Sequence, residues 1–131
     1  PSRANWQRVW VVDDQTQVLE FSRIALAAAG YQVSAFAAES EALGAAMAQG
    51  APGWPDLLIL DVIMPDGGGP GLLAALRSVG VAAPVVWTSG YTPETACLNL
   101  VDGDQRFLQK PYTGRDLVAA VQRVLDDPRS S

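Results

Sequence analysis

The feature that most constrains this chain is a repeated alternation between short apolar runs and longer segments with helical patterning. Short apolar runs that contain β-branched residues are typical of strands buried on both faces of a sheet. These runs lie at residues 8–12, 31–35, 57–60, 85–88 and 106–109. The segments that follow them are rich in helix-forming residues and lie at residues 15–29, 39–49, 70–79, 93–100 and 113–125. The alternation predicts an α/β fold, with a doubly wound five-stranded parallel sheet and helices on both faces.

Local signals indicate where two of these helices begin. Pro70 is favoured as the first helical residue because its missing N–H would be unpaired there in any case. Thr113 and Asp116 have the spacing of a capping box, which predicts the start of the last helix. The last helix also carries apolar residues at helical spacing, namely Leu117, Val118, Val121, Val124 and Leu125. That stripe predicts one face packed into a core.

Length and composition indicate a single domain. The chain has 131 residues, of which 49% are hydrophobic and 18% charged, so it has enough apolar content to build a core. We expect an N-terminal extension at residues 1–7, one domain at residues 8–127 and a C-terminal tail at residues 128–131. Because the first residue is Pro1 and not Met, we expect a processed product or an excised piece of a longer chain.

Charge and missing residue types exclude several classes of function. A net charge of −5 disfavours binding to nucleic acid and to anionic membrane surfaces. The chain contains no histidine, which excludes serine-protease-type triads, most zinc sites and a histidine phosphodonor within it. No apolar run approaches the roughly 20 residues of a membrane span and no signal peptide is visible, so we expect a cytoplasmic location.

Polar residues follow four of the predicted strands at the point where each strand ends. Asp13 and Asp14 follow the first strand, Asp61 the third, Thr88 ends the fourth, and Lys110 follows the fifth. Because the carboxyl ends of parallel strands meet at one edge of a sheet, we expect these side chains to lie close together. Three carboxylates repel one another, and a hard divalent cation such as Mg²⁺ relieves that repulsion. A cleft with Mg²⁺, an ammonium group and a free carboxylate is suited to a phosphoryl group.

Lys110 is the only lysine in the chain, and the other eight basic residues are arginines. A compact ammonium group on a flexible stem can reach a single phosphoryl oxygen where a planar guanidinium group would not fit. The position of this one lysine beside the predicted carboxylates therefore supports a phosphoryl site.

Four separated motifs resemble the receiver domain of two-component response regulators. They are VVDD, LLILDVIMPDGGG, VVWTSGY and FLQKPY, and the resemblance extends from about Arg8 to about Asp127. The residues of the last two motifs are most similar to those of receivers attached to hybrid histidine kinases. The resemblance implies a flavodoxin-like receiver fold with strand order 2-1-3-4-5.

The resemblance also implies a role for each matching residue. Asp61 would be the phosphoacceptor, and Lys110 would pair with the phosphoryl group or, in its absence, with Asp61. Thr88 would donate a hydrogen bond to the phosphoryl group in the active state, and Phe107 would be the switch aromatic that swings inward. The bond between Lys110 and Pro111 is usually cis in the family.

The metal site implied by the resemblance uses the same acidic residues. Asp14 would bind Mg²⁺ directly, Asp13 mainly through water, and Asp61 and the backbone carbonyl of Ile63 would complete the protein ligands. Taken one at a time, these residues also fit plain structural roles, since Asp is a favoured helix cap and turn residue. It is their joint placement on one edge of the sheet that favours the site.

The predicted function is acceptance of a phosphoryl group on Asp61 from a phosphohistidine of a histidine kinase or a histidine phosphotransfer domain. The domain would catalyse this transfer itself without being a kinase. Three alternatives remain: a relay or phosphate sink within a hybrid kinase, a degenerate receiver that only binds partners, and a Mg²⁺-dependent phosphatase with an aspartyl nucleophile. Phosphatases of that class need a second Asp where this chain has Ile63, which argues against the last alternative.

Three further expectations concern the surroundings of the site. We expect the glycine-rich loop at residues 66–69 to be mobile. Ile63 and Gly90 flank the expected path of a hydrolytic water, and neither side chain can orient it, which predicts a long-lived phosphoaspartate. The partner is expected to dock around the first helix, near Gln15, Val18 and Leu19.

Overall fold

The computed structural model describes residues 7–64, 68–90 and 107–126. The described strands are β1 (Arg8–Val12), β2 (Gln32–Phe36), β3 (Leu57–Asp61), β4 (Val85–Ser89) and β5 (Phe107–Gln109). The described helices are α1 (Thr16–Ala28), α2 (Glu39–Gln49), the short 3₁₀ helix η2 (Ala51–Gly53), α3 (Gly68–Val79) and α5 (Gly114–Leu125). The helix predicted at residues 93–100 lies outside the described residues, as do residues 1–6 and 127–131.

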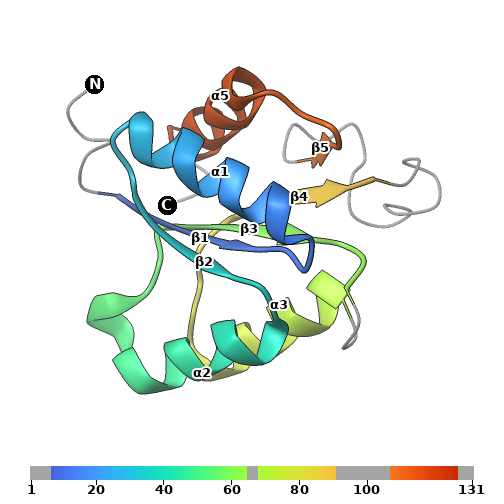
Figure 1. Cartoon of the computed structure of the whole chain (residues 1–131). Coiled ribbons are helices and arrows are strands. Elements are labelled where there is room, and N and C mark those ends of the chain that lie inside the picture. Colours follow the sequence, from blue (N-terminus) through green and yellow to red (C-terminus); the bar gives the residue numbers. More distant parts are fainter. Residues whose placement is uncertain (1–6, 65–67, 91–106, 127–131) are drawn as a thin grey trace.

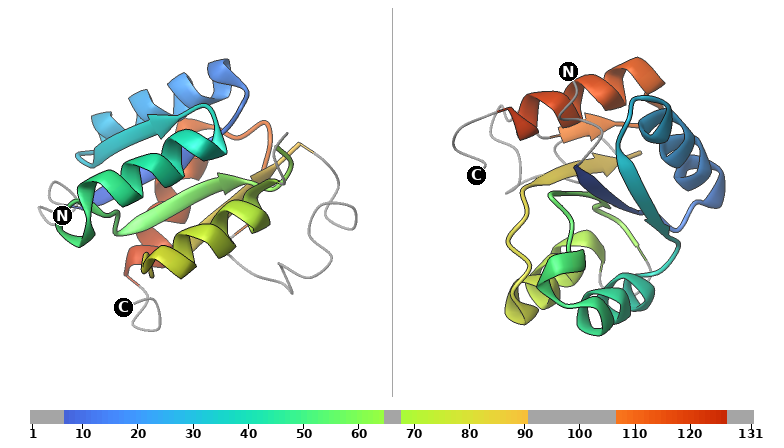
Figure 2. Two further views of the ribbon diagram at one scale, coloured as in Figure 1. Left: turned by 90° about the horizontal axis from the view of Figure 1, so that it is seen from below. Right: turned by 90° about the vertical axis from the view of Figure 1, so that its left-hand side faces the viewer.

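These strands form one parallel sheet in the order β2-β1-β3-β4-β5. Helices α1 and α5 cover one face of the sheet, and α2 and α3 cover the other (Figures 1 and 2). The predicted fold class and strand order are therefore confirmed. Within the described ranges, no helix combines the length and apolar content that crossing a membrane requires.

Two apolar clusters fix the sheet between its helical layers. Trp10, Leu58 and Leu60 point to the side of α2 and α3, where they pack with Leu72 and Leu76. The residues between them in sequence point to the other face, toward α1 and α5, and include Val9, Val11, Leu57, Ile59 and Val86. The central strands β3 and β4 are buried along their whole length, as expected for strands covered on both faces.

Most predicted boundaries agree with the structure to within one residue, and the capping box of α5 is present with both of its hydrogen bonds. The predicted start of α3 is wrong, because the helix begins at Gly68 and not at Pro70. Residue 31 is also outside β2, because the backbone N–H of Tyr31 donates to Leu26 at the end of α1. Strand β2 consequently starts at Gln32, one residue later than predicted.

Candidate functional site

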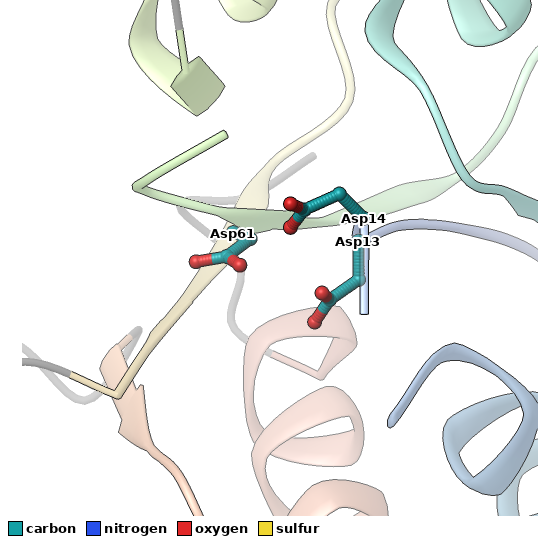
Figure 3. A group of neighbouring side chains, drawn as sticks. All are labelled: Asp13, Asp14 and Asp61. Carbon is teal, nitrogen blue, oxygen red and sulfur yellow. The ribbon is translucent and has the colours of Figure 1, made fainter. Parts of the chain in front are cut away.

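The three predicted carboxylates meet at the carboxyl ends of two neighbouring strands. Asp13 and Asp14 directly follow β1, and Asp61 is the last residue of β3, which pairs with β1. Each offers a carboxylate oxygen, and these oxygens all lie within 4.8 Å of one another (Figure 3). Asp13 and Asp61 are 2% and 4% exposed, whereas Asp14 faces solvent.

This donor set fits a hard divalent cation. It consists of carboxylate oxygens at short mutual distances, with one exposed member that leaves room for water on the outer side. Neither histidine nor cysteine belongs to the group, so its chemistry suits Mg²⁺ better than zinc.

Lys110 brings a positive charge into the centre of the acidic group. Its backbone N–H donates to Ser89 on β4 at 2.8 Å, which fixes the residue just beyond β5. Its Nζ lies 2.8 Å from Oδ2 of Asp13 and 3.0 Å from Oδ2 of Asp61. A third acceptor, Oε1 of Gln15, lies 2.7 Å from the same Nζ. The sequence predicted the pairing with Asp61 but not the contact with Gln15.

The pKa values of Asp61 and Lys110 are shifted by burial and by the sharing of one ammonium group between two carboxylates. Burial raises the pKa of Asp61 above its ordinary value, and the neighbouring charge of Asp13 adds to this, which together outweigh the hydrogen bond from Lys110. Burial alone would lower the pKa of Lys110, but hydrogen bonds to Asp13 and Asp61 outweigh it, and the net pKa is raised. Lys110 is therefore charged at neutral pH, and the site keeps an excess of negative charge.

Thr88 and Phe107 occupy the neighbouring strands. Thr88 on β4 is the register partner of Asp61 and is 1% exposed, so it is buried directly beside the end of β3. Phe107 on β5 is half-buried, pairs in register with Trp87, and packs against the core cluster under α2 and α3. Thr88 and Phe107 thus lie on the two strands that follow β3 in the sheet.

A small pocket opens in front of Asp61. It has a volume of about 320 Å³ and is lined by Asp14, Gln15, Asp61, Ile63, Gly90 and Lys110. The backbone N–H of Ile63 donates to Oδ1 of Asp61 at 3.2 Å, while the Ile63 side chain is 46% exposed. Ile63 and Gly90 thus line the same pocket as Asp61.

The glycine-rich segment after β3 contains the start of α3. The backbone N–H of Gly68 donates to Oε2 of the buried Glu39 on α2 at 3.2 Å, and Gly69 donates to the carbonyl of Val62 at 3.1 Å. Gly68 also has a φ of 77°, a conformation that favours glycine. Two N–H groups at the helix start are satisfied this way, which explains why α3 begins before Pro70. Residues 66 and 67 of the loop lie outside the described residues.

A second, larger hollow lies beside the pocket, between α1 and the segment after β5. Its volume is about 490 Å³, and its walls include Val18, Phe21, Gly90, Lys110 and Tyr112. The hydroxyl groups of Ser22 and Tyr112 lie 2.7 Å apart, and this hydrogen bond ties α1 to the segment after β5.

Two expectations about this side of the site can be checked directly. The Lys110–Pro111 bond is cis, as predicted. Leu19, however, was expected at the docking surface and is instead only 9% exposed, because it packs into the core beneath α1. The large apolar residues that α1 does expose are Phe21 and Ile24, at 44% and 54%.

A parallel sheet with an acidic cluster and a lysine at its carboxyl edge has a clear counterpart among known proteins. The family model for the response regulator receiver domain matches residues 9–122. The chain belongs to this receiver family. Receiver domains act in two-component signalling together with histidine kinases or phosphotransfer proteins.

Individual relatives agree with this assignment. The chain is 33% identical over 125 residues to the transcriptional regulatory protein PcoR of Escherichia coli, covering 95% of this chain and 54% of that protein. It is 33% identical over 119 residues to the sensor kinase CckA of Brucella abortus, covering 90% of this chain and 12% of that protein. The crystal structure of the receiver domain from the hybrid histidine kinase CckA superposes with a TM-score of 0.73 at 36% identity, covering 91% of this chain and 99% of that one. The chain therefore spans about half or less of the curated relatives named here.

Proposed function

We propose that Asp61 is the phosphoacceptor of this receiver domain and takes its phosphoryl group from a phosphohistidine on a histidine kinase or a histidine phosphotransfer domain. The observation that carries the proposal is the position of the Lys110 ammonium group, 3.0 Å from Asp61 and 2.8 Å from Asp13 at the carboxyl edge of the sheet. This arrangement places a carboxylate that can act as a nucleophile next to a fixed positive charge. Phosphoryl transfer requires both groups.

The transfer is an in-line displacement at phosphorus. An oxygen of the Asp61 carboxylate forms the new P–O bond while the P–N bond of the phosphohistidine breaks. The electron pair of that bond stays on the imidazole nitrogen, which takes up a proton from solvent. Lys110 then pairs with an oxygen of the transferred group.

Asp13, Asp14, Asp61 and the backbone carbonyl of Ile63 are the groups proposed to hold Mg²⁺. When bound, the cation neutralises charge on the phosphoryl oxygens. The close spacing of the three carboxylates within 4.8 Å supports this assignment. Exposed Asp14 can reach an ion directly, whereas Asp13 is already paired with Lys110, which is consistent with contact through water.

Thr88 and Phe107 are proposed to pass the phosphorylation state to the surface. Thr88 lies next to Asp61 in the β3–β4 register, and its hydroxyl can donate to a phosphoryl oxygen. The displacement of Thr88 would change the space available to Phe107, whose register partner is the adjacent Trp87. New charge at Asp61 would thereby bias a two-state surface at the β5 edge.

The partner that delivers the phosphoryl group is proposed to dock over the hollow between α1 and Tyr112. The exposed apolar side chain of Phe21 on α1 lines this hollow, and Lys110 lines it as well. A partner seated there would place its phosphohistidine near the acceptor pocket, which shares Gln15, Gly90 and Lys110 with the hollow.

Incubation with acetyl phosphate and Mg²⁺, followed by intact mass measurement, tests the proposal. We expect the mass of one phosphoryl group to be added to the unaltered chain and to be lost in Asp61→Asn. Asp56→Asn is the matched control, because Asp56 directly precedes the same strand β3 at its opposite end and is exposed. Labelling of Asp61→Asn, or equal loss in both variants, would contradict the assignment of the acceptor.

A small-molecule donor can fail where a protein donor succeeds. The same assay is therefore repeated with a phosphorylated histidine phosphotransfer domain. No transfer from either donor would instead favour a receiver that only binds partners. Transfer that reverses rapidly to the phosphotransfer domain would favour a relay role, which the likeness to the receiver of a hybrid histidine kinase supports.

A further inference from the structure

Gln15, the residue directly after the acidic pair, contacts the ammonium group at the centre of the site. Its Oε1 accepts a hydrogen bond from Nζ of Lys110 at 2.7 Å. Nζ also contacts Asp13 at 2.8 Å and Asp61 at 3.0 Å. An ammonium group has three N–H donors, so these three acceptors account for all of them.

The backbone around Gln15 is fixed independently of this contact. Its N–H donates to Oδ1 of Asp13 at 2.9 Å, and its carbonyl accepts from Leu19 at 2.9 Å in the first turn of α1. Gln15 is the N-cap residue of α1, yet its side chain forms no capping hydrogen bond to the helix. N-cap side chains commonly satisfy their own helix, but this one reaches Lys110, which lies 95 residues further along the chain.

The chemistry of an amide suits this place. A carboxylate at residue 15 would add a fourth negative charge to a group that already repels itself. The neutral amide oxygen accepts a hydrogen bond from the ammonium without adding charge. Gln15 and Lys110 also line both the acceptor pocket and the neighbouring hollow, so their contact forms part of the wall between the two.

We propose that Gln15 is a positioning residue that holds the Lys110 ammonium in place while one of its N–H groups changes partner from the Asp61 carboxylate to a phosphoryl oxygen. The inference rests on the proposed role of Asp61 as phosphoacceptor. Gln15 and Asp13 keep two N–H groups occupied, and the third is directed at the place where the phosphoryl group forms. Without the amide, the flexible stem of Lys110 has one restraint fewer, and the ammonium is less often in the productive position.

Replacement of Gln15 by methionine tests the contact, because methionine keeps the length of the side chain and removes the acceptor. Gln17→Met is the matched control, since Gln17 is exposed on the same helix and has no described contact with Lys110. Lys110 is the only lysine in the sequence, so isotope-labelled lysine gives a single side-chain signal by NMR. We expect ammonium protons to exchange with water about fivefold faster in Gln15→Met than in the unaltered chain or in Gln17→Met.

A second measurement connects the contact with the reaction. The rate of phosphorylation by acetyl phosphate and Mg²⁺ should fall about fivefold in Gln15→Met and stay unchanged in Gln17→Met. Gln15→Glu restores an acceptor oxygen, so it should restore slow proton exchange while its added charge keeps phosphorylation slow. A purely structural role for Gln15 does not predict this separation of the two readouts.

Two results would overturn the inference: proton exchange in Gln15→Met equal to that of the unaltered chain, or an unchanged phosphorylation rate. Failure of the unaltered chain to be phosphorylated at all would overturn the proposed function instead. The NMR signal needs no phosphoryl donor, so it separates the two failures.

Discussion

Alanine at Gly69 and alanine at Gly71 should change stability in opposite directions, although both positions lie in the first turns of α3. A Cβ built on Gly69 would lie 2.7 Å from Cζ3 of Trp87 and 3.2 Å from the carbonyl carbon of Asp61, and it would also clash with the carbonyl oxygen of Asp61. A Cβ on Gly71 meets nothing within 4 Å. The pair therefore separates the effect of close approach from that of helix propensity.

The magnitudes follow from these contacts. Gly71→Ala removes conformational freedom from the unfolded chain and should raise the free energy of unfolding by about 0.5–1 kcal/mol. Gly69→Ala also removes conformational freedom from the unfolded chain. However, the backbone of Asp61 and the buried Trp87 cannot move aside without strain, so overpacking should lower the free energy of unfolding by about 2 kcal/mol. The two variants should differ by about 3 kcal/mol, or roughly 10 °C in midpoint temperature.

Urea unfolding followed by tryptophan fluorescence measures the difference, with a common slope required for the comparison. Because the obstructing atoms belong to Asp61, the proposed acceptor, and to Trp87, the residue before Thr88, Gly69→Ala should also slow phosphorylation of Asp61 by acetyl phosphate. Gly71→Ala should leave that rate unchanged. If Gly69→Ala were as stable as Gly71→Ala, the close packing of α3 on the end of β3 would be refuted.

Three further predictions concern the site. Asp61→Asn should raise the free energy of unfolding at pH 7 by about 1 kcal/mol. Burial and the charge of Asp13 raise the pKa of Asp61 in the folded state. Above that raised pKa, the ionised carboxylate destabilises the fold. The stability advantage of Asp61→Asn in urea unfolding should therefore shrink as the pH is lowered through the folded-state pKa of Asp61. Ser22→Ala and Tyr112→Phe should each cost about 1 kcal/mol in urea unfolding, and the double variant should cost less than their sum, because each removes the same hydrogen bond. The phosphoaspartate should be long-lived, and Ile63→Asn should shorten its half-life in a mass-based decay assay, whereas rapid decay unaffected by changes at Ile63 or Gly90 would contradict this.

The sheet and its functional edge could be predicted from the sequence because both depend on local patterns. Buried parallel strands leave continuous apolar runs, and the carboxyl ends of such strands meet whatever the details of the helices. The sequence therefore predicted that Asp13, Asp61 and Lys110 lie close together, and the structure places their charged groups in contact.

The start of α3 could not be predicted in this way, because it depends on a contact distant in the sequence. Pro70 is a good first helical residue, but the carboxylate of Glu39, 29 residues earlier, accepts the N–H of Gly68 and lets the helix begin sooner. Likewise, a glutamine after two aspartates carries no signal of its own. The role inferred for Gln15 is visible only when the fold places residue 110 beside it.

The balance of charge at the edge explains why phosphorylation here should depend strictly on a divalent cation. Among the described residues, three carboxylates and one ammonium group meet at the site, which leaves an excess of two negative charges. A phosphoryl group on Asp61 replaces a single negative charge by nearly two, and Lys110, already shared, cannot compensate further. Burial of Asp13 and Asp61 strengthens the repulsion, because water screens it poorly there. The structure thus supplies carboxylates and one ammonium group, and Mg²⁺ would supply the missing positive charge.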